Sequence, residues 1–399
     1  MFNFKQYDWK KYNFALLFIV FFLEICGAFL VKYAGSAFYN PLVGASFFKR
    51  QIIWVIVSLI ITVGVSLIDY KVICDISVFI YISVSLLALA TQTPWGTSGG
   101  TGDSDARRWL KFPGFTLQPS EVCKIGIILM LAVFFAKNKE NMDSFKTFFL
   151  GGLLALVPIA CILIQPDLSS SLVIVFIFLV MVFSAGISYK IMLTFFCVTV
   201  PLIIGGLWFV QLPVVYNWLG ENEILSNVRY QIDRVVAYQH PDQYTTGLNY
   251  QQNKSILAIA SGSLFGKLGK GEISTRNYGN VSVCESDFIF TVIGEEIGFV
   301  GSCLLLALLC IVVFMCIRTA RRCKDTKGYL IAMGISAMLI FQVFANIGVA
   351  TMILPNTGLP LPFISKGITS AMCCAISIGI VLNIGMQNGT GDRSGISFL

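Results

Sequence analysis

Charge is scarce in this sequence, and histidine is almost absent. Charged residues make up 12% of the 399 positions, whereas apolar residues make up 56%. A water-soluble fold could not cover so much apolar surface with so few polar side chains. The one histidine, His240, lies in a polar stretch before a proline and is expected at the surface. A histidine-based nucleophile triad and a multi-histidine metal site are therefore excluded.

Several sequence motifs are also missing. The twelve cysteines form no C-x-x-C pair and lie mostly in apolar segments, so we expect packing residues and not metal ligands or disulfides. Cys284, in a polar stretch, is expected to be a free thiol. No G-x-x-x-x-G-K-[ST] or G-x-G-x-x-G occurs, which leaves a nucleotide site unsupported. The net charge of +7 comes from scattered residues, so no nucleic acid partner is expected.

Long apolar segments are what the sequence has in abundance. A helix that spans a membrane needs about 20 mostly apolar residues. Ten windows approach this length, at residues 14–33, 51–68, 73–91, 121–136, 147–164, 168–187, 190–211, 288–316, 329–350 and 367–386. The sequence therefore predicts an all-α polytopic membrane protein of about ten helices, forming one domain over residues 1–399.

The distribution of basic residues predicts the orientation. Lys5, Lys10 and Lys11 precede a first apolar segment that lacks a cleavage site and is expected to be a retained helix. Ten spans then place both termini in the cytoplasm, and the short loops with most Lys and Arg fall on the same side. Two loops, at about 91–120 and 212–286, are expected outside. Within the longer loop, residues 249–260 have helical spacing with one apolar side and are expected along the outer membrane surface.

Asp287 lies where the long polar loop meets the apolar segment that begins at Phe288. A carboxylate at the boundary of water and hydrocarbon can meet a lipid-tethered substrate and act as a base. Helix N-capping is the alternative role for an aspartate at this position. Glu295 and Glu296 lie about two turns deeper and are expected to be structural partners of a buried donor.

Other ionisable residues lie in or beside the apolar segments, where charge is costly and usually faces a cavity or a partner. Glu121 and Lys124 share one helix face. Asp167 follows Gln165-Pro166 directly, and Glu121 follows Gln118-Pro119 after one intervening serine. Lys124 could pair with Asp167, either to fix helix register or to bind substrate. Glu24 and Asp75 have no evident partner.

Two further segments have features of a binding site. Arg107, Arg108 and Trp109 join cations to an aromatic ring, which suits a pyrophosphate or a lipid headgroup, and also an interfacial anchor. Residues 354–365 contain three prolines and cannot form a regular helix. Irregular backbone at membrane depth must be buried or line a cavity, so this segment is expected to be a re-entrant wall.

Five motifs occur in an order that resembles the SEDS family of RodA, FtsW and SpoVE. They are Arg108-Trp109-Leu110 with Phe115 to Glu121, then Gln165-Pro166-Asp167, Ser286 to Phe290, Gly294 to Gly298, and Gly358 to Ser365. The match extends over nearly the whole chain. Asp8-Trp9 and the short tails resemble RodA more than FtsW.

The resemblance implies a peptidoglycan glycosyltransferase that polymerises lipid II at the outer face of the bacterial cytoplasmic membrane. It implies that Asp287 is the catalytic base and that Glu121, Lys124, Asp167 and Ser365 belong to the substrate cavity. Lys124, Arg107, Arg108 or a divalent cation such as Mg or Mn would neutralise the departing diphosphate of the growing lipid-linked glycan. The implied partners are a class B penicillin-binding protein, which is a transpeptidase, and membrane lipids.

The sequence departs from the family pattern around Asp287. Val283 replaces a usual acidic residue, with Glu285 nearby, and Lys366 and Ile368 replace a Tyr-Gly-Gly pattern. Lys254 stands where glutamine is common. Two other functions are therefore considered, a flippase for lipid-linked precursors and a non-catalytic scaffold for a partner synthase. No inverted repeat of the kind common in transporters is evident.

Overall fold

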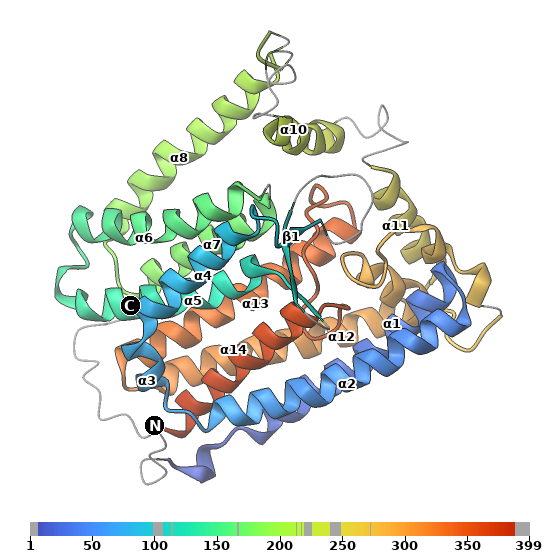
Figure 1. The fold of residues 1–399 in the computed structure, drawn as a ribbon, viewed down its shortest axis with the longest axis horizontal. Coiled ribbons are helices and arrows are strands. Elements are labelled where there is room, and N and C mark those ends of the chain that lie inside the picture. Colours follow the sequence, from blue (N-terminus) through green and yellow to red (C-terminus); the bar gives the residue numbers. More distant parts are fainter. Residues whose placement is uncertain are drawn as a thin grey trace.

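The computed structural model describes residues 7–98, 107–112, 115–165, 167–212, 214–216, 218, 226–239, 249–271 and 273–387 (Figure 1). It is built mainly of α-helices. In chain order these are α1 (Phe14–Phe38), α2 (Pro41–Ser66), α3 (Tyr70–Asp75), α4 (Ser77–Ala90), α5 (Pro119–Lys137), α6 (Phe145–Leu163), α7 (Leu168–Ser184), α8 (Tyr189–Val210), α10 (Ser226–Gln239), α11 (Tyr250–Ser261), α12 (Ile289–Arg322), α13 (Thr326–Ala350) and α14 (Ile368–Met386).

Short elements fill the connections. The 3-10 turns are η2 (Trp9–Lys11), η3 (Lys139–Asn141), η5 (Ile273–Thr275) and η6 (Asn277–Asn280). Strands β1 (Gly96–Thr97), β2 (Trp109–Phe112) and β3 (Phe115–Leu117) form an antiparallel sheet in which Leu110 lies opposite Gly96 and Leu117. The sequence does not predict this sheet, because its strands are too short to show alternation.

The ten apolar windows each correspond to a helix. Eight described helices are long and apolar enough to cross a membrane, and the shorter apolar helices α4 and α7 match the other two windows. This confirms the predicted all-α polytopic membrane fold.

The bundle is organised around α13. This helix packs against α5, α7 and α12, while α2 packs against α1 and α14. In each of α5, α13 and α14, 72% of the residues in the most apolar stretch are buried inside the protein. In α8, none of the corresponding residues is buried. Accordingly, α8 projects away from the other helices in Figure 1.

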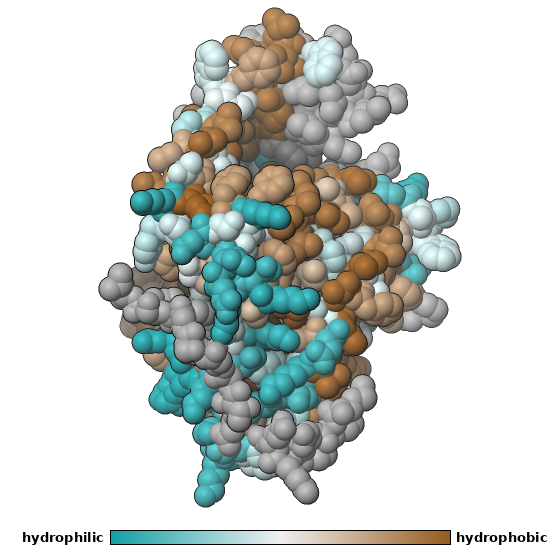
Figure 2. Space-filling model, turned by 90° about the vertical axis from the view of Figure 1, so that its left-hand side faces the viewer, coloured by the Kyte–Doolittle hydropathy of each residue, from teal (hydrophilic) through white to brown (hydrophobic). Residues whose placement is uncertain are grey.

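The two ends of the bundle differ in character. At one end, Tyr7 pairs with Gln387, and the amide of Asp8 donates to the carbonyl of Met386. Figure 2, which faces the left-hand side of Figure 1, shows hydrophilic side chains gathered below a band of apolar ones. The candidate residue Asp287 is at the opposite end, where α12 begins and α13 ends.

Helix α12 is interrupted at Gly298, which has φ +69°. The backbone of residues 263–268 lies against this break: Phe299 and Val300 donate to the carbonyls of Ser263 and Leu264, and Lys267 donates to that of Glu295. A Cβ on residue 298 would lie 2.3 Å from the nitrogen of Gly266, so only glycine fits. The break holds the loop before Asp287 against α12.

Helix α11 uses its polar side chains to bind the bundle. Nε2 of Gln252 donates to the carbonyls of Val349 and Leu354, at 2.9 Å each, while Ile256 and Leu257 are exposed. The predicted helix at 249–260 is therefore present. Ile256 and Leu257 face away from the protein, as contact with a membrane surface would require, whereas Ile259 packs beside Gly294 of α12.

The proline-rich segment 354–365 has no helix, as predicted. It is nevertheless buried, since Leu359, Leu361 and Ile364 are 3%, 1% and 0% exposed. On one side, the backbone of Ile364 touches Gly27 of α1 so closely that a Cβ there would lie 2.6 Å from the Ile364 carbonyl oxygen. The segment therefore forms an ordered wall beside α14.

Candidate active site

Asp287 does not cap α12. Phe288 holds the N-cap position, and no side chain donates or accepts a capping hydrogen bond there. The Asp287 carboxylate accepts instead from the hydroxyl of Ser286 at 3.0 Å, and the residue is only half-buried. The alternative structural role considered for Asp287 is thus not the one that the residue has.

The backbone around Asp287 is held by two buried side chains. Nδ2 of Asn346 donates both to the carbonyl of Asp287, at 2.8 Å, and to that of Leu359, at 2.7 Å. The hydroxyl of Ser365 donates to the carbonyl of Ser286 and accepts from the amide of Leu361, both at 2.7 Å. The proline-rich wall and the start of α12 are therefore joined as one unit, with the predicted residue Ser365 inside it.

Gly358 gives the carboxylate its place beside this wall. Its φ is +71°, a conformation that costs most residues energy and glycine little. A Cβ at this position would lie 3.2 Å from Oδ2 of Asp287. The absence of a side chain therefore lets the carboxylate approach the wall.

The charges around Asp287 act in both directions. Burial raises the pKa of the Asp287 carboxyl above its ordinary value, and Glu285 raises it further. The hydrogen bond from Ser286 and the nearby guanidinium groups of Arg234 and Arg108 lower it and offset part of this rise. A carboxylate with a raised pKa is a better proton acceptor than an ordinary aspartate.

The two arginines are anchored to backbone near the site. Nε of Arg108 donates to the carbonyl of Gln165 at 3.2 Å, and Nη1 of Arg234 donates to that of Asn356 at 3.1 Å. The hydroxyl of Ser169, at the start of α7, donates to the carbonyl of Thr357. The residues before β2, α10 and the start of α7, which are distant in the sequence, are thereby joined by hydrogen bonds to backbone near Asp287.

Glu285 and Lys366 form an ion pair next to α2, with Nζ 3.3 Å from Oε1. The amide of Lys366 also donates to the carbonyl of Glu285 at 2.9 Å, and Nζ lies 3.5 Å from the centroid of the Phe47 ring. Val283 nearby has φ +59°, which is strained for a β-branched side chain. Three of the departures from the family pattern, at Val283, Glu285 and Lys366, thus lie together close in the chain or in space to the candidate base.

Glu295 and Glu296 are structural, as predicted. Glu295 accepts from Lys267, Ser261 and the amides of Asn277 and Tyr278. Glu296 accepts from Nε of Arg276 and the hydroxyl of Tyr278, at 2.7 Å each. Both are fully buried and hold the polar loop against α12.

Comparison with known proteins assigns the family. A family model for cell cycle proteins of the FtsW, RodA and SpoVE type matches residues 14–390. The chain belongs to the FtsW/RodA/SpoVE family. This confirms the resemblance, while the preference for RodA over FtsW stays a prediction.

Relatives of this SEDS protein match along most of their length. A probable peptidoglycan glycosyltransferase FtsW from Bacillus subtilis is 33% identical, over 94% of this chain and 91% of the relative. One with the same description from Geobacter metallireducens is 32% identical, over 94% and 95%. The stage V sporulation protein E of Bacillus subtilis is 30% identical, over 92% and 95%.

Solved structures share the fold. A chain from a peptidoglycan synthase complex is 25% identical, with a TM-score of 0.72 over 94% of this chain and 98% of that one. The rod shape determining protein RodA of Thermus thermophilus is 24% identical, with a TM-score of 0.63 over 94% and 97%.

The polar residues of α5 and α7 are arranged differently from one expectation for this SEDS protein. Nζ of Lys124 pairs with Glu121 at 2.6 Å, and both side chains are buried. Asp167 instead accepts from the hydroxyls of Ser120 and Ser170, at 3.1 and 2.7 Å, and caps α7. The pairing of Lys124 with Asp167 was therefore wrong, because the lysine has a partner one turn away on its own helix.

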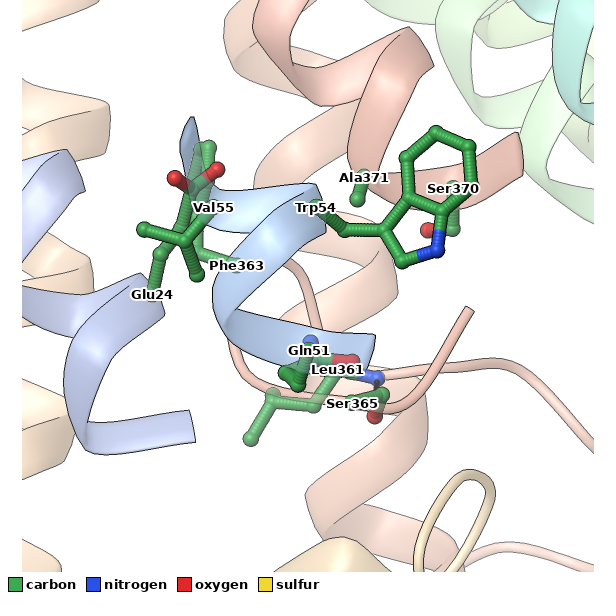
Figure 3. A pocket seen from close by; sticks show the side chains of 9 residues that line it. All are labelled: Glu24, Gln51, Trp54, Val55, Leu361, Phe363, Ser365, Ser370 and Ala371. Atoms are coloured by element: carbon green, nitrogen blue, oxygen red, sulfur yellow. Dashed lines mark hydrogen bonds between the residues drawn. The ribbon is translucent and has the colours of Figure 1, made fainter. Parts of the chain in front are cut away.

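Two hollows lie outside the Asp287 region. Figure 3 shows a narrow pocket between α1, α2 and the wall, with room for about one water molecule, lined by Glu24, Gln51 and Ser365 among others. Glu24 accepts from the hydroxyl of Ser58 at 2.5 Å, a partner that the sequence did not reveal. An apolar cavity of about 280 Å³ lies between α7, α8 and α13, lined by residues such as Phe183, Met192 and Met333.

Of the remaining predicted site residues, Arg107 is exposed and Trp109 is half-buried in β2. Cys284 is a buried free thiol, and burial raises its pKa. His240 lies outside the described residues. Among the described residues, no three His, Cys, Asp or Glu side chains lie together so that they could hold a metal ion.

Sequence reasoning missed Arg234, Asn346 and Gly358. Asn346 could have been found, because a buried amide in an otherwise apolar helix is costly unless it has a task. Arg234 lies in α10, within the polar stretch 212–286, and has no motif that marks it, while the role of Gly358 depends on a contact that only the folded chain makes.

Proposed function

We propose that this SEDS protein is a glycosyltransferase that polymerises lipid II into glycan strands, with Asp287 as the general base. The observation that carries the proposal is the state of Asp287. Its carboxylate is half-buried with a raised pKa, it does not cap the helix beside it, and two arginines lie near it. The names of the relatives, which are probable peptidoglycan glycosyltransferases, support the same reaction.

The chemistry requires one proton transfer and one displacement. Asp287 accepts the proton of a sugar hydroxyl on the acceptor, and the hydroxyl oxygen forms a bond to the anomeric carbon of the donor. The bond between that carbon and the diphosphate breaks, and the polyprenyl diphosphate leaves with the electron pair. The growing glycan is thereby transferred to the acceptor.

The arginines supply the charge that the leaving group needs. Guanidinium groups bind phosphate through two parallel hydrogen bonds and keep their charge at any physiological pH. Cations held close to the leaving diphosphate stabilise the negative charge that develops on it, so they stabilise the transition state more than the bound substrate. Arg108 and Arg234 are assigned this role, and the buried pair of Glu121 and Lys124 supports the helices behind the site.

A divalent cation, Mg or Mn, is proposed as a further source of positive charge at the substrate diphosphate. Mg²⁺ usually binds through one or two carboxylates together with substrate phosphates. The described acidic residues form no cluster that would hold such an ion. Substrate diphosphate would therefore supply most of the ligands.

The proposed setting is the bacterial cytoplasmic membrane, with both termini in the cytoplasm and Asp287 at the outer face. The basic residues of the short loops favour this orientation. A class B penicillin-binding protein is the proposed partner. Support comes from the structural relative, which belongs to a synthase complex that coordinates polymerization and crosslinking.

The test uses purified protein with lipid II, alone and with the candidate partner, comparing the wild type with Asp287→Ala. We expect glycan chains from the wild type and none from the variant. Translocation of lipid II across vesicle membranes without polymer would favour the flippase. Polymer formed equally by both proteins would assign the reaction to the partner and make this chain a scaffold.

A further inference from the structure

Polymerisation, on the function proposed above, brings two diphosphates to one base. The donor carries the diphosphate that leaves, and the acceptor carries one that stays attached to its own lipid. Because Asp287 must lie between the two sugars, the two diphosphates have to lie on different sides of it. Each diphosphate can therefore be bound by a cationic group of its own near Asp287.

Arg108 and Arg234 form one cationic group near Asp287. Their backbone contacts are with Gln165, which follows α6, and with Asn356, at the start of the wall. Both guanidinium groups are near enough to lower the pKa of the Asp287 carboxyl. Permanent charges in this position suit the diphosphate that gains charge as it leaves.

Lys366 contacts a different part of the bundle, next to α2. It follows Ser365, whose hydroxyl holds the carbonyl of Ser286, and its own amide holds that of Glu285. Nζ lies 3.5 Å from the centroid of the Phe47 ring of α2, and 39% of the side chain is exposed. The ammonium group is thus fixed near the base and open to the surroundings.

We propose that Lys366 binds the diphosphate of the acceptor substrate, with Glu285 as the group that it exchanges for this ligand. The 3.3 Å contact between Nζ and Oε1 of Glu285 is long for a charge-assisted hydrogen bond. The Lys366 side chain is 39% exposed and that of Glu285 only 8%, so a ligand reaches this pair from the lysine side. A diphosphate carries more charge than one carboxylate and can displace it without unfolding the loop.

The narrow pocket that Ser365 helps to line limits where the acceptor diphosphate lies. Gln51, one turn beyond Phe47, lines the pocket, which has room for about one water molecule (Figure 3). Glu24 at the same pocket would repel a phosphate. The acceptor diphosphate therefore lies outside the pocket, at the exposed ammonium group.

The assignment predicts a specific kinetic effect. The charge of the acceptor diphosphate does not change during transfer, so Lys366 binds the ground state and the transition state equally. Removing it should raise KM for the acceptor and leave kcat unchanged. Removing Arg234 should instead lower kcat.

The experiment separates donor from acceptor. A labelled lipid II whose acceptor hydroxyl is capped with galactose serves only as donor, and unlabelled lipid II is varied as acceptor. We expect Lys366→Gln to raise the acceptor KM about tenfold, as for the loss of one charged contact, with kcat within about twofold of the wild type. Lys366→Arg should restore the KM, and Glu285→Gln should lower it.

Lys32→Gln is the matched control, because Nζ of Lys32 on α1 lies over the ring of Phe48, the residue of α2 next to Phe47, 5.7 Å from its centroid. Its acceptor KM should equal that of the wild type. A lower kcat with an unchanged acceptor KM in Lys366→Gln would overturn the proposal, as would an increased KM for the capped donor instead. Absence of labelled product from the wild type would refute the proposed function itself.

Discussion

The first turns of α12 carry two kinds of acidic residue, and the contrast between them identifies the candidate base. Glu296 accepts from Arg276 and Tyr278, and Glu295 accepts from four donors, with both side chains fully buried. Asp287, just before the helix, accepts from the hydroxyl of Ser286 at 3.0 Å and is only half-buried.

Glu295 accepts through both oxygens and Glu296 is paired through Oε1 with a buried guanidinium, so both stabilise the fold, whereas a half-exposed carboxylate can accept a proton from a ligand. The loop contacts of Glu295 and Glu296 also position Asp287, because they hold residues 261–278 against α12. Two acidic residues with a structural role thus follow the candidate base along the chain.

The largest effects should separate these two roles. Asp287→Asn keeps the shape of the side chain and removes the base, so polymerisation should fall about 10²- to 10⁴-fold while the protein stays folded. Glu296→Gln should instead destabilise the fold by about 3–5 kcal/mol, because Arg276 keeps a buried charge without its partner. Polymerisation rates and thermal unfolding in detergent measure both. Loss of folding in Asp287→Asn, or normal stability in Glu296→Gln, would contradict the contrast.

Gly358→Ala should have the next largest effect. The new Cβ would lie 3.2 Å from Oδ2 of Asp287, and alanine at φ +71° costs about 1 kcal/mol. We expect kcat to fall about tenfold or more, as for a misplaced catalytic group, with little change in the unfolding temperature. Gly64→Ala is the control, because a Cβ at Gly64 would have no neighbour within 4 Å. Equal kcat values for the two variants would show that the close approach is unimportant.

Asn346→Leu should have a smaller effect on the same carboxylate. The variant loses the donor shared by Asp287 and Leu359, so the base is less well positioned and kcat should fall severalfold, with the pH profile unchanged. Gln342→Leu, one turn earlier on α13 and equally buried at 1% exposed, is the matched control. If both variants lose the same activity, Asn346 contributes only packing.

Periodicity and composition predicted the parts of this structure that depend on hydrophobic burial. The ten helices follow from apolar length, and the structural role of Glu295 and Glu296 follows from their depth. The wall at 354–365 follows from its prolines. Lys124 shows the limit of this reasoning, because two partners were compatible with its spacing and only packing selects Glu121.

The site itself depends on contacts between distant segments. The sequence identifies Asp287 because it directly precedes an apolar segment. Arg234, Asn346 and Gly358 lie close to Asp287 only in the folded chain. No local pattern encodes these approaches. The exposed state of Lys366 and its position over Phe47 likewise follow from packing of α2 against the wall.

The smallest predicted effect concerns the pH dependence of the base. Burial and Glu285 raise the pKa of Asp287, and a general base works only when deprotonated, so activity should be lost as the pH falls through this raised pKa. Glu285→Gln removes a neighbouring negative charge and should move the acid limb of kcat to lower pH. Arg234→Gln removes a positive charge and should move it to higher pH. Rates normalised to each variant's maximum, at saturating lipid II, measure the shift. Acid limbs that coincide in all three proteins would show that another group, and not Asp287, accepts the proton.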